Sequence, residues 1–391
     1  KWHLETQPQG FTYWQILPGQ GSYYNPDFIM MDSSKRRIEG YVANVVEDVA
    51  EDWLNKRDTT KPFCLVIGHK NTHRNWIPDT CNFGMYDNSN FPLPKNFYDS
   101  YDGREAAKVQ DMTIAKTMIM GYDLKMFESE EAANKEGSIS RMNMQQREKF
   151  DAYYKAIYND FKRKNLSGNA LSEWKYQRYM KDYLATAVSL DRNIGRTLGY
   201  LDKHQLSQNT IVIYLSDQGF YMGEHGWFDK RFMYEESFRT PMMMRYPGKI
   251  TPGTIDSNMV LNLDVGPTLL QAAGVTIPKD MQGKSFLSLA ENKNVKGRKA
   301  MYHHYYENGE HSVSPHFGIS TGRYKLIRFY KRVNSWELYD LETDKTEMNN
   351  LFGNRQYKKI QSGLKKQLLK LIDEYDDKEA KEILCTEPII N

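Results

Sequence analysis

The sequence predicts an α/β fold that is followed by a smaller α+β region. Two short, continuous apolar runs, at 63–67 and 210–215, have the composition of strands buried on both faces of a sheet. Each run follows a helical pattern and ends in polar residues, which is typical of α/β architecture. From about residue 300, short aromatic-rich strands replace this alternation, so a separate subdomain is expected there.

Composition places the chain among ordinary globular proteins. Its 391 residues suggest two or three domains, or one large domain with an appendage. With 40% hydrophobic and 26% charged residues, disordered, collagen-like and disulfide-knot classes are excluded. The net charge of +3 is too weak to indicate a nucleic-acid partner. No apolar stretch approaches the ~20 residues of a membrane helix, and the three cysteines lack zinc-site spacing.

Apolar residues at helical spacing predict helices at about 40–56, 150–161 and 184–201. Asp191 lies within the apolar stripe of the third helix, so we expect it to be buried and hydrogen-bonded. Residues 79–140 form a long polar segment between the first and second of these helices. A strand is expected at 242–246 and a helix at 263–274. The predicted domains are an α/β domain at 1–290 and a C-terminal subdomain at 300–391, with strands at 301–306, 315–320, 324–330 and 336–341 and a helix at 356–375.

Polar side chains follow both buried strands. His69 to Arg74 follow the first strand, and Asp217 and Gln218 follow the second. Sites in open α/β sheets form at the carboxyl ends of the strands, so these two clusters are expected at one site. The alternative is that His73 is an ordinary loop histidine.

The segment 217–231 contains three glycines, which allow the backbone to approach a ligand closely. The oxygens of Asp217 and Gln218 suit a hard cation, Ca²⁺ or Mg²⁺. Lys230 supplies positive charge for an anionic substrate. The alternative is a solvated, glycine-rich surface loop.

Lys1 and His3 add a further Lys/His pair near the start of the chain. Together with His73, Lys230 and the oxygens of Asp217 and Gln218, these residues predict a cationic pocket around a metal ion. Such a pocket suits the ester of an oxyanion, either sulfate or phosphate.

In several of its motifs, the chain resembles the type I sulfatases of the alkaline phosphatase superfamily. One segment departs from the family pattern, because Thr72 stands where proline is usual. The matching segments run in the family order and cover nearly the whole chain: Lys1–Leu4, His69–Arg74, Asp191–Arg196, Ile213–Gly219, Gly223–Lys230 and Glu337–Leu341.

The resemblance implies a large, mixed and mostly parallel sheet flanked by helices. It also implies that Asp217 and Gln218 bind Ca²⁺, in preference to Mg²⁺. Lys1 and His3 match residues near the sulfate and the nucleophile, and Lys230 matches the second sulfate-binding lysine. An extracytoplasmic location (periplasmic, secreted or lysosomal) follows from the family as well.

In the same comparison, His73 matches the histidine that protonates the leaving alcohol. That role is chemically coherent, because negative charge grows on the bridging oxygen while the sulfate ester breaks.

The family nucleophile is a formylglycine made from Cys or Ser in a C/S-x-P-x-R motif, and no such motif occurs in the 391 residues. The first pair of metal-binding aspartates is also missing. Both precede the Lys1–Leu4 motif in the family, so we expect them upstream of Lys1. We expect the 391-residue chain to be unable to hydrolyse sulfate esters by itself.

The substrate expected from the resemblance is a sulfated carbohydrate, first of all 6-O-sulfated N-acetylglucosamine of a glycosaminoglycan. The run 226–237 resembles sulfatases that act on such sugars. We expect Arg74, His225 and His311 to contact the sugar. His303, His304 and His316 are able to do the same, with polar surface as the alternative reading.

Two other functions remain open from the sequence. One is a phosphonate or phosphate ester hydrolase of the same superfamily, and the other is a non-catalytic binder of sulfated glycans. The residues that precede Lys1 discriminate among all three.

Overall fold

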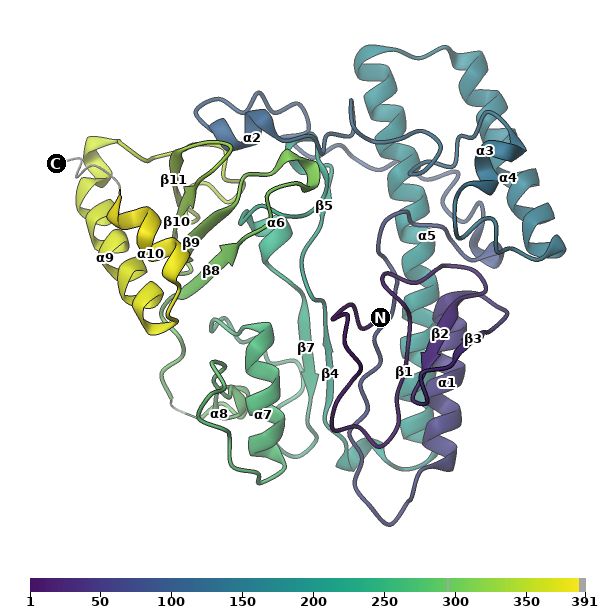
Figure 1. Ribbon diagram of the computed structural model, residues 1–391, viewed down its shortest axis with the longest axis horizontal. Helices are drawn as coiled ribbons and strands as arrows, with labels where there is room; N and C mark the ends of the chain where they lie inside the picture. Colours follow the sequence, from purple (N-terminus) through teal and green to yellow (C-terminus); the bar gives the residue numbers. More distant parts are fainter. Residues whose placement is uncertain (294, 387–391) are drawn as a thin grey trace. The chain divides into compact units, whose positions relative to one another are not determined.

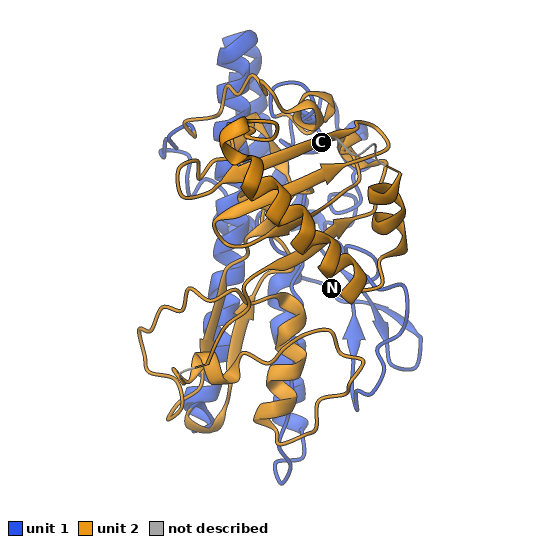
Figure 2. Cartoon of the chain, turned by 90° about the vertical axis from the view of Figure 1, so that its left-hand side faces the viewer, with its two compact units in different colours: residues 1–93, 114–207 blue, residues 94–113, 208–391 orange. Residues whose placement is uncertain are grey.

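The computed structural model describes residues 1–293 and 295–386. The chain forms two compact units, one of residues 1–93 with 114–207 and one of residues 94–113 with 208–391 (Figure 2). The predicted division at residues 290–300 stays a prediction. None of the described helices is long and apolar enough to cross a membrane.

In the first unit, the 36-residue helix α5 is the longest element (Figure 1). Helix α1 lies along it, and Thr197 of α5 donates a hydrogen bond to Glu47 of α1 at 2.7 Å. The three short strands pair antiparallel in the order β1-β2-β3. The elements of this unit are β1 (Gln15–Ile16), β2 (Asp27–Met30), β3 (Lys35–Arg37), α1 (Val42–Lys56), α3 (Glu130–Asn134), α4 (Met144–Lys164) and α5 (Gly168–Lys203).

All three helices predicted for this unit are confirmed, and two extend beyond the predicted bounds. Helix α4 begins six residues earlier than its apolar stripe, because Asn143 and Gln146 form a capping box with both hydrogen bonds at 2.9 Å. Such a polar cap is invisible to apolar periodicity.

The expectation for Asp191 is wrong, because its side chain is exposed on α5. The buried carboxylate of this helix is Asp182, which accepts hydrogen bonds from Lys125 and Tyr154, both at 3.1 Å, and from Arg178. A buried charge needs such partners. The face of α5 that packs against the unit is therefore largely polar, which the apolar pattern could not predict.

The strand expected at 63–67 is also wrong, since these residues form no ladder with any described strand. Val66 is 69% exposed, whereas the composition of the run is that of a strand buried on both faces. An apolar run becomes a strand only when a partner satisfies its backbone groups.

In the second unit, β4 (Val212–Leu215) pairs antiparallel with β7 (Met242–Arg245), which confirms both predicted strands. All ladders among the described strands are antiparallel, and the expected large, mostly parallel sheet is not among the sheets that they form. The other elements before residue 300 are α2 (Glu105–Val109), β5 (Tyr221–Met222), β6 (Phe228–Asp229), α6 (Glu235–Phe238), α7 (Val265–Ala272) and α8 (Leu287–Ala290).

The predicted C-terminal strands and helix are confirmed. They form a four-stranded antiparallel sheet in the order β11-β10-β9-β8, and α9 packs on one face of it (Figure 1). Side chains alternate between the two faces along each strand. The elements are β8 (Met301–Tyr305), β9 (His316–Ser320), β10 (Tyr324–Phe329), β11 (Ser335–Asp340), α9 (Lys358–Glu374) and α10 (Lys378–Cys385).

Three histidines of this sheet, considered above as sugar contacts or polar surface, are instead packed inside the subdomain. Burial lowers the pKa of His303 to about 4 and that of His316 to about 3. The Nδ1 atom of His304 lies 2.6 Å from the Asp377 carboxylate. These side chains stabilise the sheet, and none is available to a sugar.

Candidate active site

In the first unit, Lys1 lies against the segment that carries the predicted histidines. Its backbone nitrogen donates to the carbonyl oxygen of Gly68, directly before His69. A Cβ atom at Gly68 would lie only 2.9 Å from the carbonyl oxygen of Lys1, so this close approach requires glycine. The structure thus joins Lys1 to the His69–Arg74 segment. His3 is exposed and contacts Gln20 at 3.1 Å.

The two site residues that end this segment are held by specific partners. The carbonyl oxygen of His73 accepts a hydrogen bond from Tyr23, and its Nδ1 lies 2.8 Å from the carbonyl oxygen of Arg74. Arg74 forms a bidentate pair with the fully buried Asp123, at 2.6 and 2.7 Å. Such a pair fixes the guanidinium firmly, so its planar face is oriented before any ligand binds. Sequence reasoning missed Asp123, which lies in the long polar segment.

In the second unit, the turn after β4 carries Asp217 and Gln218. Asp217 is exposed and Gln218 half-buried. The amide of Asn262 donates to the carbonyl oxygens of Ser216 and Asp217, at 3.2 and 3.1 Å, and so holds the turn. Gly219 follows, where a Cβ atom would lie 2.1 Å from the carbonyl oxygen of Glu236. Only glycine allows the turn to approach α6 this closely.

Lys230 and His311 meet at Asp229. The Asp229 carboxylate lies 2.9 Å from His311 Nε2 and 3.5 Å from Lys230 Nζ. Burial alone would raise the pKa of Asp229, yet the hydrogen bond from His311 and the nearby cations hold it well below its usual value. Asp229, Arg231 and His311 all have positive φ, a conformation that is costly for these residues and that concentrates at functional sites.

His225 is not placed to contact a sugar, contrary to our expectation. Its side chain is fully buried, and its Nδ1 lies 2.7 Å from the equally buried Asp99. Asp99 also accepts a hydrogen bond from Arg104 at 2.5 Å, while Tyr101 donates to the His225 carbonyl oxygen at 2.8 Å. These partners come from residues 94–113, so His225 fastens the loop that bears Lys230 to that segment.

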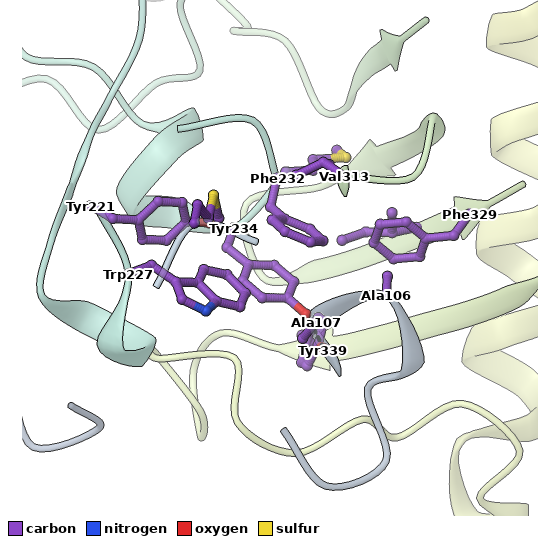
Figure 3. Close-up of a cluster of buried hydrophobic side chains, with 12 residues drawn as sticks. Ala106, Ala107, Tyr221, Trp227, Phe232, Tyr234, Val313, Phe329 and Tyr339 are labelled. Carbon is purple, nitrogen blue, oxygen red and sulfur yellow. Dashed lines mark hydrogen bonds between the residues drawn. The ribbon is translucent and has the colours of Figure 1, made fainter. Parts of the chain in front are cut away.

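An aromatic cluster fixes the same loop to the C-terminal sheet (Figure 3). Trp227 stacks on Phe232, with ring centroids 4.9 Å apart, and Tyr234 donates to the buried Glu337 of β11 at 2.8 Å. On β9, a Cβ atom at Gly318 would lie 2.9 Å from the sulfur of Met233, so glycine lets the loop reach the sheet. The position of Lys230 therefore depends on strands about 90 residues further along the chain.

A family model described as Sulfatase matches residues 1–275, which is more than half of the chain. The chain belongs to the sulfatase family, the type I sulfatases of the alkaline phosphatase superfamily. A second model, N-sulphoglucosamine sulphohydrolase C-terminal, matches residues 223–374 of this sulfatase. The combination confirms the resemblance and the α/β class of the alkaline phosphatase superfamily, while the ladders of the described strands are antiparallel.

Individual proteins that are similar to this chain are also sulfatases. An N-acetylglucosamine-6-O-sulfatase of Bacteroides thetaiotaomicron is 45% identical over 388 residues, which are 96% of this chain and 68% of that protein. An arylsulfatase of Clostridium perfringens is 30% identical over 84% of this chain and 57% of its own length. This sulfatase therefore spans about two thirds or less of these relatives.

A solved structure, BT4656 in complex with its substrate D-glucosamine-2-N,6-O-disulfate, matches this sulfatase with a TM-score of 0.93 and 44% identity. The match covers 97% of this chain and 79% of that one. The α/β architecture is thus shared over nearly all of this sulfatase.

Members of this family bind a divalent metal ion. Asp217 and Gln218 fit such an ion in type, because carboxylate and carboxamide oxygens are hard donors. They do not complete a site, since Ca²⁺ takes six to eight oxygen ligands. Within residues 1–293 and 295–386, no group of three or more His, Cys, Asp or Glu side chains is arranged to hold a metal ion.

One buried carboxyl group of the loop in this sulfatase has an unusual protonation state. Burial raises the pKa of Glu236 to about 8, and the carboxylates of Glu347 and Glu224 add to the shift. Glu236 Oε2 has no hydrogen-bond partner among the described residues and lies 3.9 Å from His225 Nε2. Glu236 is therefore protonated at neutral pH.

A Glu236→Gln variant is expected to gain stability over the wild type as pH rises from 6 to 9. The folded state keeps a proton that the unfolded chain releases above pH ~4.5, so the wild type loses stability up to the folded pKa, whereas glutamine does not titrate. The stability of the variant relative to the wild type is expected to be about 1–3 kcal/mol higher at pH 9 than at pH 6. Urea unfolding at both pH values measures it, and a constant difference would contradict the raised pKa.

Proposed function

We propose that this sulfatase removes the 6-O-sulfate group from N-acetylglucosamine units of a sulfated glycosaminoglycan. The observation that carries the proposal is the 45% identity, over 96% of the chain, to a protein named N-acetylglucosamine-6-O-sulfatase. The complex of the structural neighbour with D-glucosamine-2-N,6-O-disulfate supports the same substrate class.

In this proposal, Lys1 and Lys230 bind the negatively charged sulfate oxygens. Lys230 is suited to this role because Asp229 holds its ammonium group at 3.5 Å and because its side chain is only 11% exposed. A cation in such a partly dry environment stabilises growing negative charge more strongly than one in water. His3 lies near the sulfate as well.

His73 protonates the bridging oxygen while the bond from this oxygen to sulfur breaks and the sulfur bonds to the nucleophile of the complete gene product, so the sugar leaves as an alcohol. A carbonyl oxygen only accepts hydrogen bonds, and the carbonyl oxygen of Arg74 lies 2.8 Å from Nδ1. Nδ1 must therefore carry a hydrogen. Nε2 can deliver a proton to the substrate only when the ring is an imidazolium that carries hydrogens on both nitrogens.

Asp229 and His311 of the second unit bind the sugar ring in this proposal, and Arg74 of the first unit stays a predicted sugar contact. Asp229 Oδ1 is buried and faces the Lys230 ammonium group at 3.5 Å, but it accepts no hydrogen bond from the described residues, so we propose that it accepts one from a sugar hydroxyl. His311 orients this carboxylate through the contact at 2.9 Å. Unlike His225, this pair lies directly beside Lys230.

We further propose that the divalent ion is Ca²⁺ and that Asp217 and Gln218 bind it. The described residues do not supply the other oxygen ligands that the ion needs. When bound, the ion supplies positive charge to the sulfate oxygens. An extracytoplasmic location is proposed as well, because it is typical of the family.

A substrate panel tests the function. The complete gene product is expected to release sulfate from 6-sulfated N-acetylglucosamine faster than from an aryl sulfate, a 2-O-sulfated uronate or a phosphate monoester. The physical reason is that an aryl sulfate has no sugar hydroxyls for Asp229 and His311, while a uronate adds a carboxylate that the Asp229 carboxylate repels.

Cleavage of the 2-O-sulfated uronate without the 6-sulfate would reject the substrate. A preference for the phosphate monoester would favour the phosphoesterase, and binding without any hydrolysis would favour the non-catalytic binder.

A further inference from the structure

Helix α9 presents a row of lysines away from the sheet that it covers. Leu364, Leu368 and Ile372 are buried against the strands. Lys359, Lys366 and Lys370 are four or seven residues apart, so they align on the opposite side of the helix. Figure 2 shows α9 crossing the outside of the second unit, on the side that lies at the left in Figure 1. With Lys358, which is also exposed, these lysines form what we name the basic face of α9.

The charge around this face is one-sided. Residues 348–372 contain six cations and no Asp or Glu, and the two acidic residues of α9, Asp373 and Glu374, follow at its C-terminal end, where Asp373 pairs with Lys381. The whole chain has a net charge of only +3, so the remaining residues together are net acidic. The positive charge is thus concentrated on one short segment rather than spread over the surface.

Local electrostatics on α9 are unfavourable for the helix itself. Lys358 and Lys359 begin the helix, where its dipole disfavours cations, and its first turn contains no acidic residue. Lys366 and Lys370 form a like-charge i,i+4 pair, which is destabilising. In the part of the chain that the structure describes, no carboxylate forms an ion pair with any lysine of the basic face.

Helix α4 shows the ordinary arrangement for comparison. Its Arg147 pairs with Asp151 at 2.7 Å, and its Lys164 pairs with Asp160 at 2.7 Å. A helix that keeps unfavourable, uncompensated charge is best explained by an anionic partner that relieves the repulsion.

We propose that the basic face of α9 binds the sulfated polysaccharide chain to which the hydrolysed sugar belongs. The inference rests on the proposed function, which makes a polymer with repeated sulfate groups the polyanion that this protein meets. From Lys358 to Lys370 the helix rises by about 18 Å, enough to face more than one sugar unit. Lysine-rich segments of this kind are typical of heparin-type binding.

This site is distinct from the one that contains Lys230. The loop of Lys230 packs on the sheet face that contains Ile327, Phe329 and Tyr339, whereas α9 packs on the face that contains Leu326 and Leu338. The four-stranded sheet therefore separates the two. Binding at α9 retains the polymer near the enzyme and raises the local concentration of cleavable sulfate esters.

The test compares two variants of the complete gene product, each lacking four positive charges. Glutamine replaces lysine because it is also a good helix former. The α9 variant carries the substitutions Lys358→Gln, Lys359→Gln, Lys366→Gln and Lys370→Gln. The control variant changes four exposed lysines elsewhere, through Lys149→Gln, Lys155→Gln, Lys279→Gln and Lys299→Gln.

Heparin, at low and at physiological salt, is the probe for binding. The α9 variant is expected to bind it at least about tenfold more weakly than the wild type, with a reduced dependence on salt, and the control less than about twofold more weakly. Hydrolysis of the 6-sulfated monosaccharide is expected to be unchanged in both variants, while KM for the polymer rises in the α9 variant alone.

Equal losses in both variants would overturn the proposal, because binding would then follow net charge alone. Wild-type affinity for duplex DNA or for phosphatidylserine vesicles that equals the affinity for heparin would overturn it as well. A wild type that binds heparin through α9 yet does not cleave the monosaccharide would instead reject the proposed function and leave the binding site standing.

Discussion

Replacing Lys230 with alanine is expected to lower kcat/KM for the sulfated sugar by on the order of 10²–10³ in the complete gene product. The lost interaction is between the ammonium group and the sulfate oxygens, which gain charge as the ester bond breaks. Folding should change little, because Asp229 keeps its contact with His311 at 2.9 Å. The free energy of unfolding is expected to fall by about 1 kcal/mol. Steady-state kinetics and urea unfolding measure the two effects.

Two further variants sharpen this experiment. Lys230→Arg keeps the charge and should recover part of the activity, while Lys249→Ala removes an exposed lysine and should have no effect. Unchanged turnover of Lys230→Ala would show that Lys230 does not bind the sulfate.

Replacing Asp99 with alanine is expected to lower the free energy of unfolding by about 3–5 kcal/mol. The carboxylate is fully buried and pairs with Arg104 at 2.5 Å and with His225 at 2.7 Å. Its removal leaves the buried guanidinium of Arg104 without its counter-charge. Activity should fall as well, because His225 fastens the loop of Lys230. Chemical unfolding of the variant and the wild type measures the loss.

The pH dependence provides an independent check on Asp99. Burial alone would raise its pKa, but the hydrogen bonds from His225 and Arg104 lower it. Its contribution is therefore present above the ordinary carboxyl pKa of ~3.9 and declines as pH falls below it. Asp52→Ala is the matched control, since Asp52 forms an exposed pair with Lys56 that is worth about 0–1 kcal/mol. An equally small loss for Asp99→Ala would contradict the buried network.

Apolar periodicity and motif spacing predicted the elements whose partners are near in sequence or regular in pattern. The strands after residue 300, the strand at 212–215 and helix α9 were confirmed for this reason. Lys230 and His311 were chosen separately from the sequence, and the structure brings both to Asp229.

The carboxylates that organise these side chains were beyond sequence reasoning. Asp99 and Asp123 lie in a polar segment that has no periodicity, and their partners His225 and Arg74 are 126 and 49 residues away. A buried charge pair leaves no local pattern, since each member alone resembles a solvated residue. The same limit explains His225, whose surroundings of glycine and charge suggested an exposed loop.

The packing of the Lys230 loop on β9, β10 and β11 sets the order in which the protein matures during synthesis. Residues 219–238 leave the ribosome about 100 residues before β11 is complete, several seconds earlier at ordinary translation rates. Until then Trp227, Phe232 and Tyr234 have only each other and residues 94–113 to pack on and lack the sheet, so the nascent chain exposes aromatic surface that favours aggregation or chaperone binding. Lys230 reaches its working position only when the last strands have been made.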